Sequence, residues 1–554
     1  MCRGRANRIF DAIGWSSAIA GRRRQRPDSR IVRICWSVLL FVMLLFTSGC
    51  TSWREYFSNG FKVGPNFSRP PAPVAPQWID AADARVRSEG GDLSRWWTVF
   101  KDPVLDSLID TAYRQNLTLR DAGFRILQAR AQLGIAVGNV FPQTQNMSGD
   151  YLREAASKNT ANRSFIATRF YDQWDYNFNL AWELDFWGRF RRMVESADQS
   201  LNVSIENYDA VLVTLLGDVA TNYVLIRTLE RQIELTRQNV ALQGQTLTLA
   251  NARFQGGTAT DLDVEQAKTI MKQTEAQIPV LEIGLRMANN QLCVLLGTPP
   301  EDLHKLLGSG NIPTAPATAI VGIPADLIRR RPDVLEAEHA AAAQSAQVGV
   351  AEAQFYPHIS LTGTLDYSAQ KPGKLIEPGS LQGIVGPTYT WNLLNYFRIL
   401  NNVKYQDALL QQLIVDYQNT VLVAAREVEN GLVTYLKSQE ETRSQAESVE
   451  AAQKAVEIAL AQYRGGQVDF NRVAVLETAL VQQQNILAQA RGQIAIGLIQ
   501  VYRALGGGWQ FRIDPDNPTP ASTNVQPAAP LPAAEPNKQP ETLPSPQRLP
   551  ATSP

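Results

Sequence analysis

Two segments of this chain are nearly the same, AQLGIAVGNVFP at Ala131–Pro142 and AQVGVAEAQFYP at Ala346–Pro357. They lie 215 residues apart, and each brings a helical pattern to an end at a proline. A second matching pair, ARFQGGTATDLDV at Ala252–Val264 and AQYRGGQVDFNRV at Ala461–Val473, lies 209 residues apart and places a Gly-Gly turn in each copy. Repetition at a fixed spacing decides architecture before any single motif does. The chain is therefore a tandem duplication.

The duplication predicts one body built from two similar halves, which we place at residues 96–310 and 311–509. The chain has 53 basic and 53 acidic residues, so its charge gives no indication of nucleic-acid binding. Residues 50–95 are rich in proline, above all in VGPNFSRPPAPVAP at Val63–Pro76, and predict an extended segment lying over a surface. Residues 510–554 are dominated by small and polar side chains and predict a disordered tail.

The first 49 residues predict a bacterial export signal. A group of arginines precedes the apolar stretch Ile34–Phe46, which is too short to span a bilayer comfortably, and two small residues come directly before Cys50. This order is similar to that of a lipoprotein signal, in which Cys50 would be the lipidated first residue of the mature chain. The alternative is a membrane-anchoring helix with an ordinary cysteine. Cys293 stands alone on an apolar helical face and predicts a small core residue.

Long helices are predicted in both halves. Apolar residues at spacings of three and four predict a helical stretch that begins near Trp96 and ends by Pro142. From Ile205 to Ile233 they follow the seam of a coiled coil, and no proline interrupts residues 188–256, a span of roughly 100 Å as helix. A partner helix is expected after the first turn, and a similar pair in the second half: Asp261–Leu296, then Arg398–Tyr463 and Val468–Leu505. Two coiled-coil hairpins result.

Segments with a period of two lie between the leading helix and the long helix of each half. In DYNFNLAWELDFWGR, apolar residues from Tyr176 to Phe186 alternate with mostly polar ones from Asn177 to Asp185. The second half has two such strands, around Ile359–Tyr367 and Val385–Leu393, and a weaker counterpart lies at Asn146–Tyr151. We therefore expect four strands.

One apolar and one polar face suit either a soluble sheet on a core or a membrane barrel around water. The export signal, the aromatic apolar faces and strand lengths near about 10 residues favour the barrel. Four strands cannot close a barrel, because bacterial barrels need about eight or more. The chain must then pool strands from several copies, and three copies would give twelve. In this register Glu183 and Asp185 face the lumen.

The chain resembles the TolC-like outer-membrane factor family, specifically its NodT-type efflux lipoproteins. The resemblance lies in motifs spread in order along the chain: VGPNFSRP at Val63–Pro70, WWTVFKDPVLDSLI at Trp96–Ile109, WELDFWGRFRR at Trp182–Arg192, GIPADLIRRRPDVLEAE at Gly322–Glu338 and YRALGGGW at Tyr502–Trp509. It implies a mainly α protein with a membrane β-barrel. Duplicated helical hairpins would form a periplasmic tunnel, and four strands per protomer would enter a homotrimeric barrel of twelve.

The same resemblance implies a passive exit duct in the outer membrane, embedded in outer-membrane lipid. An inner-membrane pump, usually of the proton-driven resistance, nodulation and division class, would load the substrate, and a periplasmic adaptor would join pump and channel. The adaptor would contact the turns Gly256-Gly257 and Gly465-Gly466. Candidate gate residues beside these turns are Asp469, Arg472 and Glu477, with Asp261 and Asp263 in the first half. The alternative for each is a solvated residue that caps a helix.

No catalytic apparatus is recognisable, and we expect no enzyme activity, cofactor or metal. His304, His339 and His358 have no partner at metal-ligand spacing, and the chain has neither a nucleophile elbow nor a phosphate loop. The main rival is a periplasmic coiled-coil adaptor or a structural lipoprotein without a pore, although adaptors would carry small β domains flanking a single hairpin. A third interpretation is an exit duct for a secreted protein rather than for small molecules. The basic cluster Arg329–Asp333 predicts a helix start at its proline.

Overall fold

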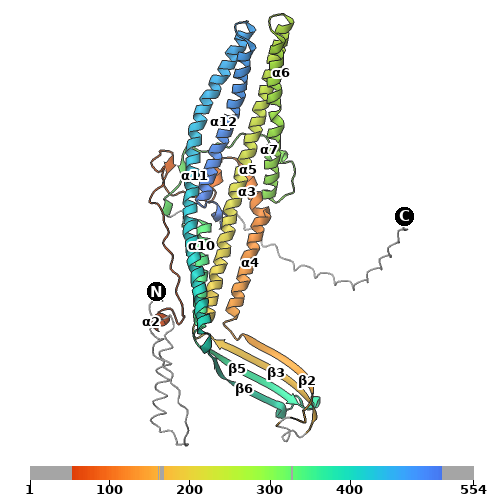
Figure 1. Cartoon of the computed structure of the whole chain (residues 1–554), viewed down its shortest axis with the longest axis vertical. Coiled ribbons are helices and arrows are strands. Elements are labelled where there is room, and N and C mark those ends of the chain that lie inside the picture. Colours follow the sequence, from red (N-terminus) through yellow and green to blue (C-terminus); the bar gives the residue numbers. More distant parts are fainter. Residues whose placement is uncertain (1–52, 160, 162–167, 326–328, 514–554) are drawn as a thin grey trace, which may run out of the picture. The chain divides into compact units, whose positions relative to one another are not determined.

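The computed structural model describes residues 53–159, 161, 168–325 and 329–513. Cys50, the predicted export signal and nearly all of the predicted tail lie outside these residues, and the described residues from Trp53 to Trp509 belong to one compact unit. Two similar runs of elements follow each other in it (Figure 1). The first comprises α3 (Pro103–Gln115), α4 (Leu117–Gly138), β2 (Thr144–Ala155), β3 (Phe170–Leu184), α5 (Arg189–Gln255), α6 (Asp261–Glu275) and α7 (Gln277–Leu296). The second comprises α10 (Pro332–Ala353), β5 (His358–Ala369), β6 (Leu381–Thr390), α11 (Tyr396–Arg464) and α12 (Phe470–Ala504).

The two long helices confirm the predicted hairpins. Helix α5 has 67 residues and α11 has 69, so each is roughly 100 Å long. Each ends at a Gly-Gly pair whose second glycine has a positive φ, 72° at Gly257 and 74° at Gly466, a conformation that an L side chain resists. An apolar stretch of α5 is long enough to cross a membrane, but 61% of it is buried inside the protein, as expected of a core helix.

Two predicted helices are interrupted in the structure. The leading helix of the first half breaks at Asn116, whose side-chain oxygen accepts from the N–H of Leu119 at 2.8 Å and so starts α4. The returning helix breaks at Ala276, between α6 and α7. The break is explained by Pro279, which lies four residues after Glu275, the last residue of α6. A proline ring clashes with the carbonyl four residues earlier and has no N–H to donate to it, so the helix is interrupted there.

Four strands form one antiparallel sheet in the order β2-β3-β5-β6, which confirms the four strands predicted for the barrel. Two short strands that were not predicted, β1 (Val86–Arg87) and β4 (Ala319–Ile320), pair in parallel as a separate sheet. The weakly patterned strand β2 pairs with β3 in a register that sets Met147 opposite Phe178 and Tyr151 opposite Trp174. Strand β3 pairs in turn with β5, with Phe178 opposite Leu365. Helix α5 begins shortly after β3 and ends at the first Gly-Gly turn, so the sheet and that turn lie at opposite ends of a long helix.

The proline-rich segment is anchored before the first predicted half begins. Residues 62–75 contain neither helix nor strand, although α2 (Trp53–Ser58) precedes them within the segment predicted to be extended. Val63 is buried, and Arg192 of α5 donates to the carbonyls of Val63 (3.0 Å) and Gly64 (2.8 Å). Gly64 also lies so close to Gly349 that a Cβ on it would be 2.4 Å from the Gly349 Cα. Ordered packing therefore starts well before Trp96, because a buried arginine holds the segment by its backbone.

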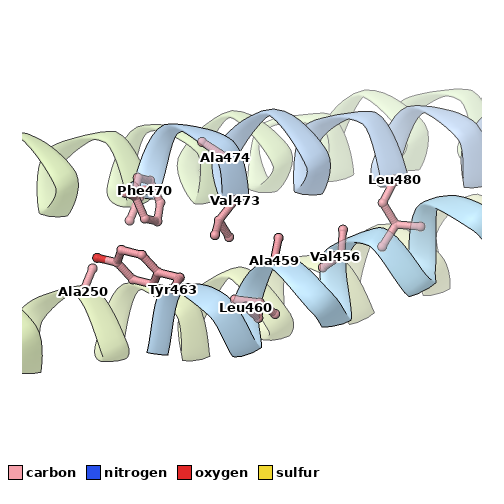
Figure 2. Close-up of a cluster of buried hydrophobic side chains, with 10 residues drawn as sticks. Ala250, Val456, Ala459, Leu460, Tyr463, Phe470, Val473, Ala474 and Leu480 are labelled. Atoms are coloured by element: carbon pink, nitrogen blue, oxygen red, sulfur yellow. The ribbon is translucent and has the colours of Figure 1, made fainter. Parts of the chain in front are cut away.

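The ends of the hairpins beside the turns share one apolar core (Figure 2). Tyr463 of α11 and Phe470 of α12 lie on either side of the second turn and meet edge to face, with ring centroids 5.6 Å apart. Ala250 of α5 and Ala267 of α6 join the same buried cluster, so the core includes both hairpins. Small side chains at these contacts allow the helices to approach closely.

Candidate functional site

The register of the sheet sorts its side chains into two faces. Phe178 aligns with Met147 and Leu365 on one face, whereas Asn177 aligns with Ser148 and Asp366 on the other. The alternation continues across β6, where Val385 and Tyr389 lie on the apolar face and are 75% and 77% exposed in the single chain. Leu152 and Ile384 are apolar exceptions on the polar face. A sheet that is apolar on one face and polar on the other matches the wall of a membrane barrel around a water-filled lumen.

Glu183 and Asp185, the two residues predicted to face the lumen, lie where β3 turns into α5. Glu183 is on the polar face, and its carboxylate pairs with Arg189 at 2.6 Å and with Nδ1 of His358 at 2.8 Å. Asp185 lies one residue beyond the end of β3 and accepts from the backbone N–H groups of Phe190 (2.8 Å) and Arg191 (3.0 Å). The strand is thus shorter than its sequence pattern, because Asp185 satisfies free N–H groups at the start of α5. A role for either residue in conduction stays a prediction.

The helix starts beside the two turns are capped by predicted site residues. The carboxylate of Asp469 accepts from the N–H of Arg472 at 3.1 Å, and that of Asp263 accepts from the N–H of Thr260 at 3.1 Å. The side chains of Asp469 and Arg472 are exposed, as is that of Asp261. Capping accounts for the placement of Asp469 and Asp263 and leaves their charges in contact with solvent, so it does not exclude a gate role.

Glu477 lies inside the protein rather than at its surface. It is 2% exposed, on the side of α12 that faces α5, and one carboxylate oxygen accepts from the hydroxyl of Thr246 at 2.7 Å. Burial raises the pKa of Glu477 above its ordinary value, and the Thr246 hydrogen bond offsets part of this rise. Its neighbour in sequence, Leu476, packs against the apolar core beside the turns.

Glu477 belongs to a polar seam between the hairpins, which we define as Thr236, Asn239, Gln243 and Thr246 of α5 with Glu477 and Gln484 of α12. The four α5 members are all buried, and Asn239 donates to the side-chain oxygen of Gln484 at 2.7 Å. The apolar coiled-coil pattern of α5 thus gives way to polar residues toward the turn. Sequence inspection missed the seam, although these residues recur at helical spacing.

Arg253 and Tyr463 join the two turns, a contact that the sequence did not reveal. The guanidinium carbon of Arg253, near the end of α5, lies 4.5 Å from the ring centroid of Tyr463, near the end of α11. Such a cation–π contact contributes about 0.5–2 kcal/mol according to its exposure. The only signal in the sequence is that both residues lie just before a Gly-Gly pair.

Within the described parts of the chain, no group of three or more His, Cys, Asp and Glu residues is arranged to hold a metal ion. Two of the three histidines have side-chain partners: Nδ1 of His339 lies 2.8 Å from the side-chain oxygen of Gln199, and His358 pairs with Glu183. Cys293 is fully buried, as expected for a core residue.

Comparison with known proteins agrees with this geometry. Residues 108–298 and 323–507 match the family described as outer membrane efflux protein. The chain is 28% identical over 470 residues to Nodulation protein T of Rhizobium leguminosarum bv. trifolii, across 84% of this chain and 98% of that protein. It is 31% identical over 456 residues to outer membrane protein OprJ of Pseudomonas aeruginosa, across 81% and 93%. The solved outer-membrane channel OprN matches with a TM-score of 0.76 at 28% identity, over 81% of this chain and 99% of that one.

An amphipathic four-stranded sheet joined to long helical hairpins defines one protomer of an outer-membrane channel that extends into the periplasm. The chain belongs to the outer membrane efflux protein family, and it is an efflux channel of the outer membrane. The resemblance to TolC-like outer-membrane factors, drawn from its motifs, is confirmed.

Proposed function

We propose that three copies of this chain close a twelve-stranded barrel over a continuous helical tunnel. The proposal rests on the two edges of the sheet, because among the described residues β2 and β6 each pair with only one other strand. Backbone groups left unpaired in lipid cost several kcal/mol each, so a membrane sheet must close on itself. Three copies of a four-stranded sheet give an even number of strands within the range of bacterial barrels.

The helices also present apolar surfaces that a second copy would cover. Val280 and Met287 of α7 are both 68% exposed in the single chain, and Val415 and Leu422 of α11 are 60% and 51% exposed. Clusters of exposed apolar side chains on helices generally mark an interface. Packing α7 of one copy against α11 of the next would continue the wall of the tunnel.

The periplasmic end lies at the turns Gly256-Gly257 and Gly465-Gly466 in this proposal. A periplasmic adaptor contacts these turns and connects the channel to an inner-membrane pump of the resistance, nodulation and division class. Asp469 and Arg472 are exposed beside the second turn and would act on passing ions directly. Glu477 would act indirectly, because its buried contact with Thr246 holds α12 against α5.

The rival without a pore is an adaptor or structural lipoprotein built on the same hairpins. The sheet argues against it, because Val385 and Tyr389 on its apolar face are 75% and 77% exposed, whereas a soluble sheet buries its apolar face against a core. Lipidation of Cys50 belongs to the proposal as a second attachment to the outer membrane. The conducted substrate, small molecule or secreted polypeptide, would be set by the pump and adaptor.

Light scattering and planar-bilayer conductance of the detergent-purified mature chain test the proposal. We expect the mass of three chains and small, cation-selective openings. Arg472→Ala should enlarge the openings, whereas Arg491→Ala should not, because Arg491 is also an exposed arginine of α12 but lies farther from the turn. Folded trimers without conductance in any variant would refute the pore, and a conducting monomer would refute the pooled barrel.

A further inference from the structure

Two joints connect the helices that carry the turns to the helices that lead into the sheet. Helix α7 ends beside the start of α4, and the Asn116 side-chain N–H donates to the carbonyl of Leu295 at 2.9 Å. Helix α12 ends beside the start of α10, and Arg331 donates to the carbonyl of Ala504 at 2.5 Å. In both joints, the residue directly before one helix satisfies a carbonyl in the last turn of another, which has no partner within its own helix.

The joints are copies of each other. Asn116 and Arg331 are separated by 215 residues, the spacing of the first repeated pair of segments. Leu295 and Ala504 are separated by 209, the spacing of the second pair. The glycine two residues beyond each acceptor also matches, with φ of 74° at Gly297 and 70° at Gly506. The two joints therefore have the same donor, acceptor and glycine positions, but the donor is asparagine in the first half and arginine in the second.

The first joint is neutral and tightly packed. A Cβ on Gly297 would be 2.4 Å from the carbonyl oxygen of Gln115, so the two backbones are already in close contact. Asn116 is 7% exposed and is held from both sides, because its side-chain oxygen accepts from Leu119 while its N–H donates to Leu295. No charged group takes part in these hydrogen bonds.

The second joint is ionic. Arg331 pairs with Asp333 at 2.7 Å and with Glu427 of α11 at 2.8 Å. Arg331 is buried, whereas the side chains of Asp333 and Glu427 are 37% and 45% exposed, so solvent and salt reach the acidic partners. A pocket of about 570 Å³ adjoins the joint, and its lining includes Arg331, Glu427 and Arg503. The backbones are also less tightly packed at the second joint, because a Cβ on Gly506 would be 3.2 Å from the Arg331 Cα, compared with 2.4 Å from the Gln115 oxygen at Gly297.

The second joint lies at one end of α12, and the candidate gate residues Asp469 and Arg472 lie at the other. Helix α12 has 35 residues and is about 50 Å long. A tilt of about 5° at the joint would move the far end of such a helix by about 4 Å. A small change in the ion pairs of Arg331 would therefore become a large displacement beside the turn.

We propose that Arg331 is a positioning residue whose ion pairs fix α12 on α10 and α11 and so set how far the periplasmic end of the channel opens. The inference rests on the proposed pore. The neutral joint at Asn116 keeps the first hairpin in place while the second hairpin moves. The charged joint thus allows the second of the two duplicated hairpins to change its tilt.

A distance measurement separates this inference from the pore itself. A spin label on a cysteine at Gln467, an exposed residue of the second turn, reports the distance between copies in the trimer by electron–electron resonance. Arg331→Asn gives the second joint the chemistry of the first, and Glu427→Gln removes one ion pair but retains the contacts of Arg331 with Asp333 and Ala504. An outward displacement of about 4 Å in each copy of a three-fold trimer changes the distance between copies by about 7 Å, so both changes should lengthen that distance by up to about 7 Å and enlarge the conductance.

Controls decide the outcome. Arg331→Lys retains a charge and a donor, so the distance between the labels should stay near that of the wild type. Arg330→Asn changes an exposed neighbour and should leave the distance and the conductance unchanged. If Arg331→Asn does not form trimers, Glu427→Gln decides alone. Trimeric Glu427→Gln with an unchanged distance and conductance would overturn the inference. A shifted distance in a protein that never conducts would support the joint and refute the pore.

Discussion

Helices α11 and α12 pack through glycines, and replacing one of them should separate the helices. Gly497 of α12 lies against the backbone of α11, where a Cβ would be 2.7 Å from the nitrogen of Tyr435 and 2.9 Å from its Cα. Gly431 of α11 makes the reciprocal contact, with 2.9 Å from a Cβ to the nitrogen of Val501. Because the obstructing atoms are backbone, no side-chain rotation can relieve the contact.

Gly497→Ala should lower the free energy of unfolding by about 0.5–2 kcal/mol. To restore an ordinary contact of 3.4 Å, the helices must separate by roughly 0.7 Å. Overpacking of this kind costs about 1–3 kcal/mol, and the better helix propensity of alanine returns about 0.5–1 kcal/mol. The net loss should appear as a lower unfolding temperature.

Thermal unfolding followed by circular dichroism in detergent measures the change. Gly134→Ala is the matched control, because Gly134 lies inside α4 and a Cβ there would meet nothing within 4 Å. That substitution should stabilise the protein by about 0.5–1 kcal/mol through helix propensity alone. If both variants gain stability equally, the close approach of α11 and α12 is not a constraint and the reasoning fails.

Three further substitutions test burial, backbone conformation and the membrane face. Glu477→Gln should raise the unfolding temperature at neutral pH, because burial raises the pKa of Glu477 in the folded protein and its charge destabilises the fold above that pKa. The gain in unfolding temperature should vanish as the pH falls below 4.5, the ordinary pKa of a glutamate, where the carboxyl group is neutral in both states. An equal gain at pH 4 and pH 8 would contradict the burial of a charged Glu477. Gly297→Ala should destabilise more than Gly257→Ala in the same melting assay: both have positive φ, but only the first also meets backbone, and equal losses would show that the contact is unimportant. Phe178→Arg should cost about 2–4 kcal/mol in refolding into lipid vesicles and Asn177→Arg much less, and similar costs would argue against the assigned lipid face.

Much of the architecture was readable because local patterns determine it. The Gly-Gly pairs end α5 and α11 where the sequence predicts, since only glycine adopts the positive φ of the second position without strain. The period of two identifies the strands without knowledge of their partners, since alternation of apolar and polar residues depends only on strand geometry. Duplication doubled each signal, which is why even the weakly patterned strand β2 could be expected.

The candidate site was readable only in part. Asp469 lies beside its turn as expected, because a helix cap is a local feature. Asp185 continues the alternation of β3 in sequence, yet its carboxylate caps α5, a contact that becomes visible only once the strand end and the helix start are placed together. Glu477 looked like a surface charge beside a turn, and only the packing of α12 against α5 shows that it is buried.

The sequence by itself determined the two repeated halves, the long helices, the four strands and the positions of the turns, because each follows from spacing along one segment. Tertiary structure alone decided which residues from different segments meet. The register that aligns Met147 with Phe178 and Leu365, the contact of Arg253 with Tyr463 and the joint of Arg331 with Ala504 all belong to this class. Such contacts join residues far apart in the chain, and their partners are chosen by how whole helices and strands pack rather than by any local pattern.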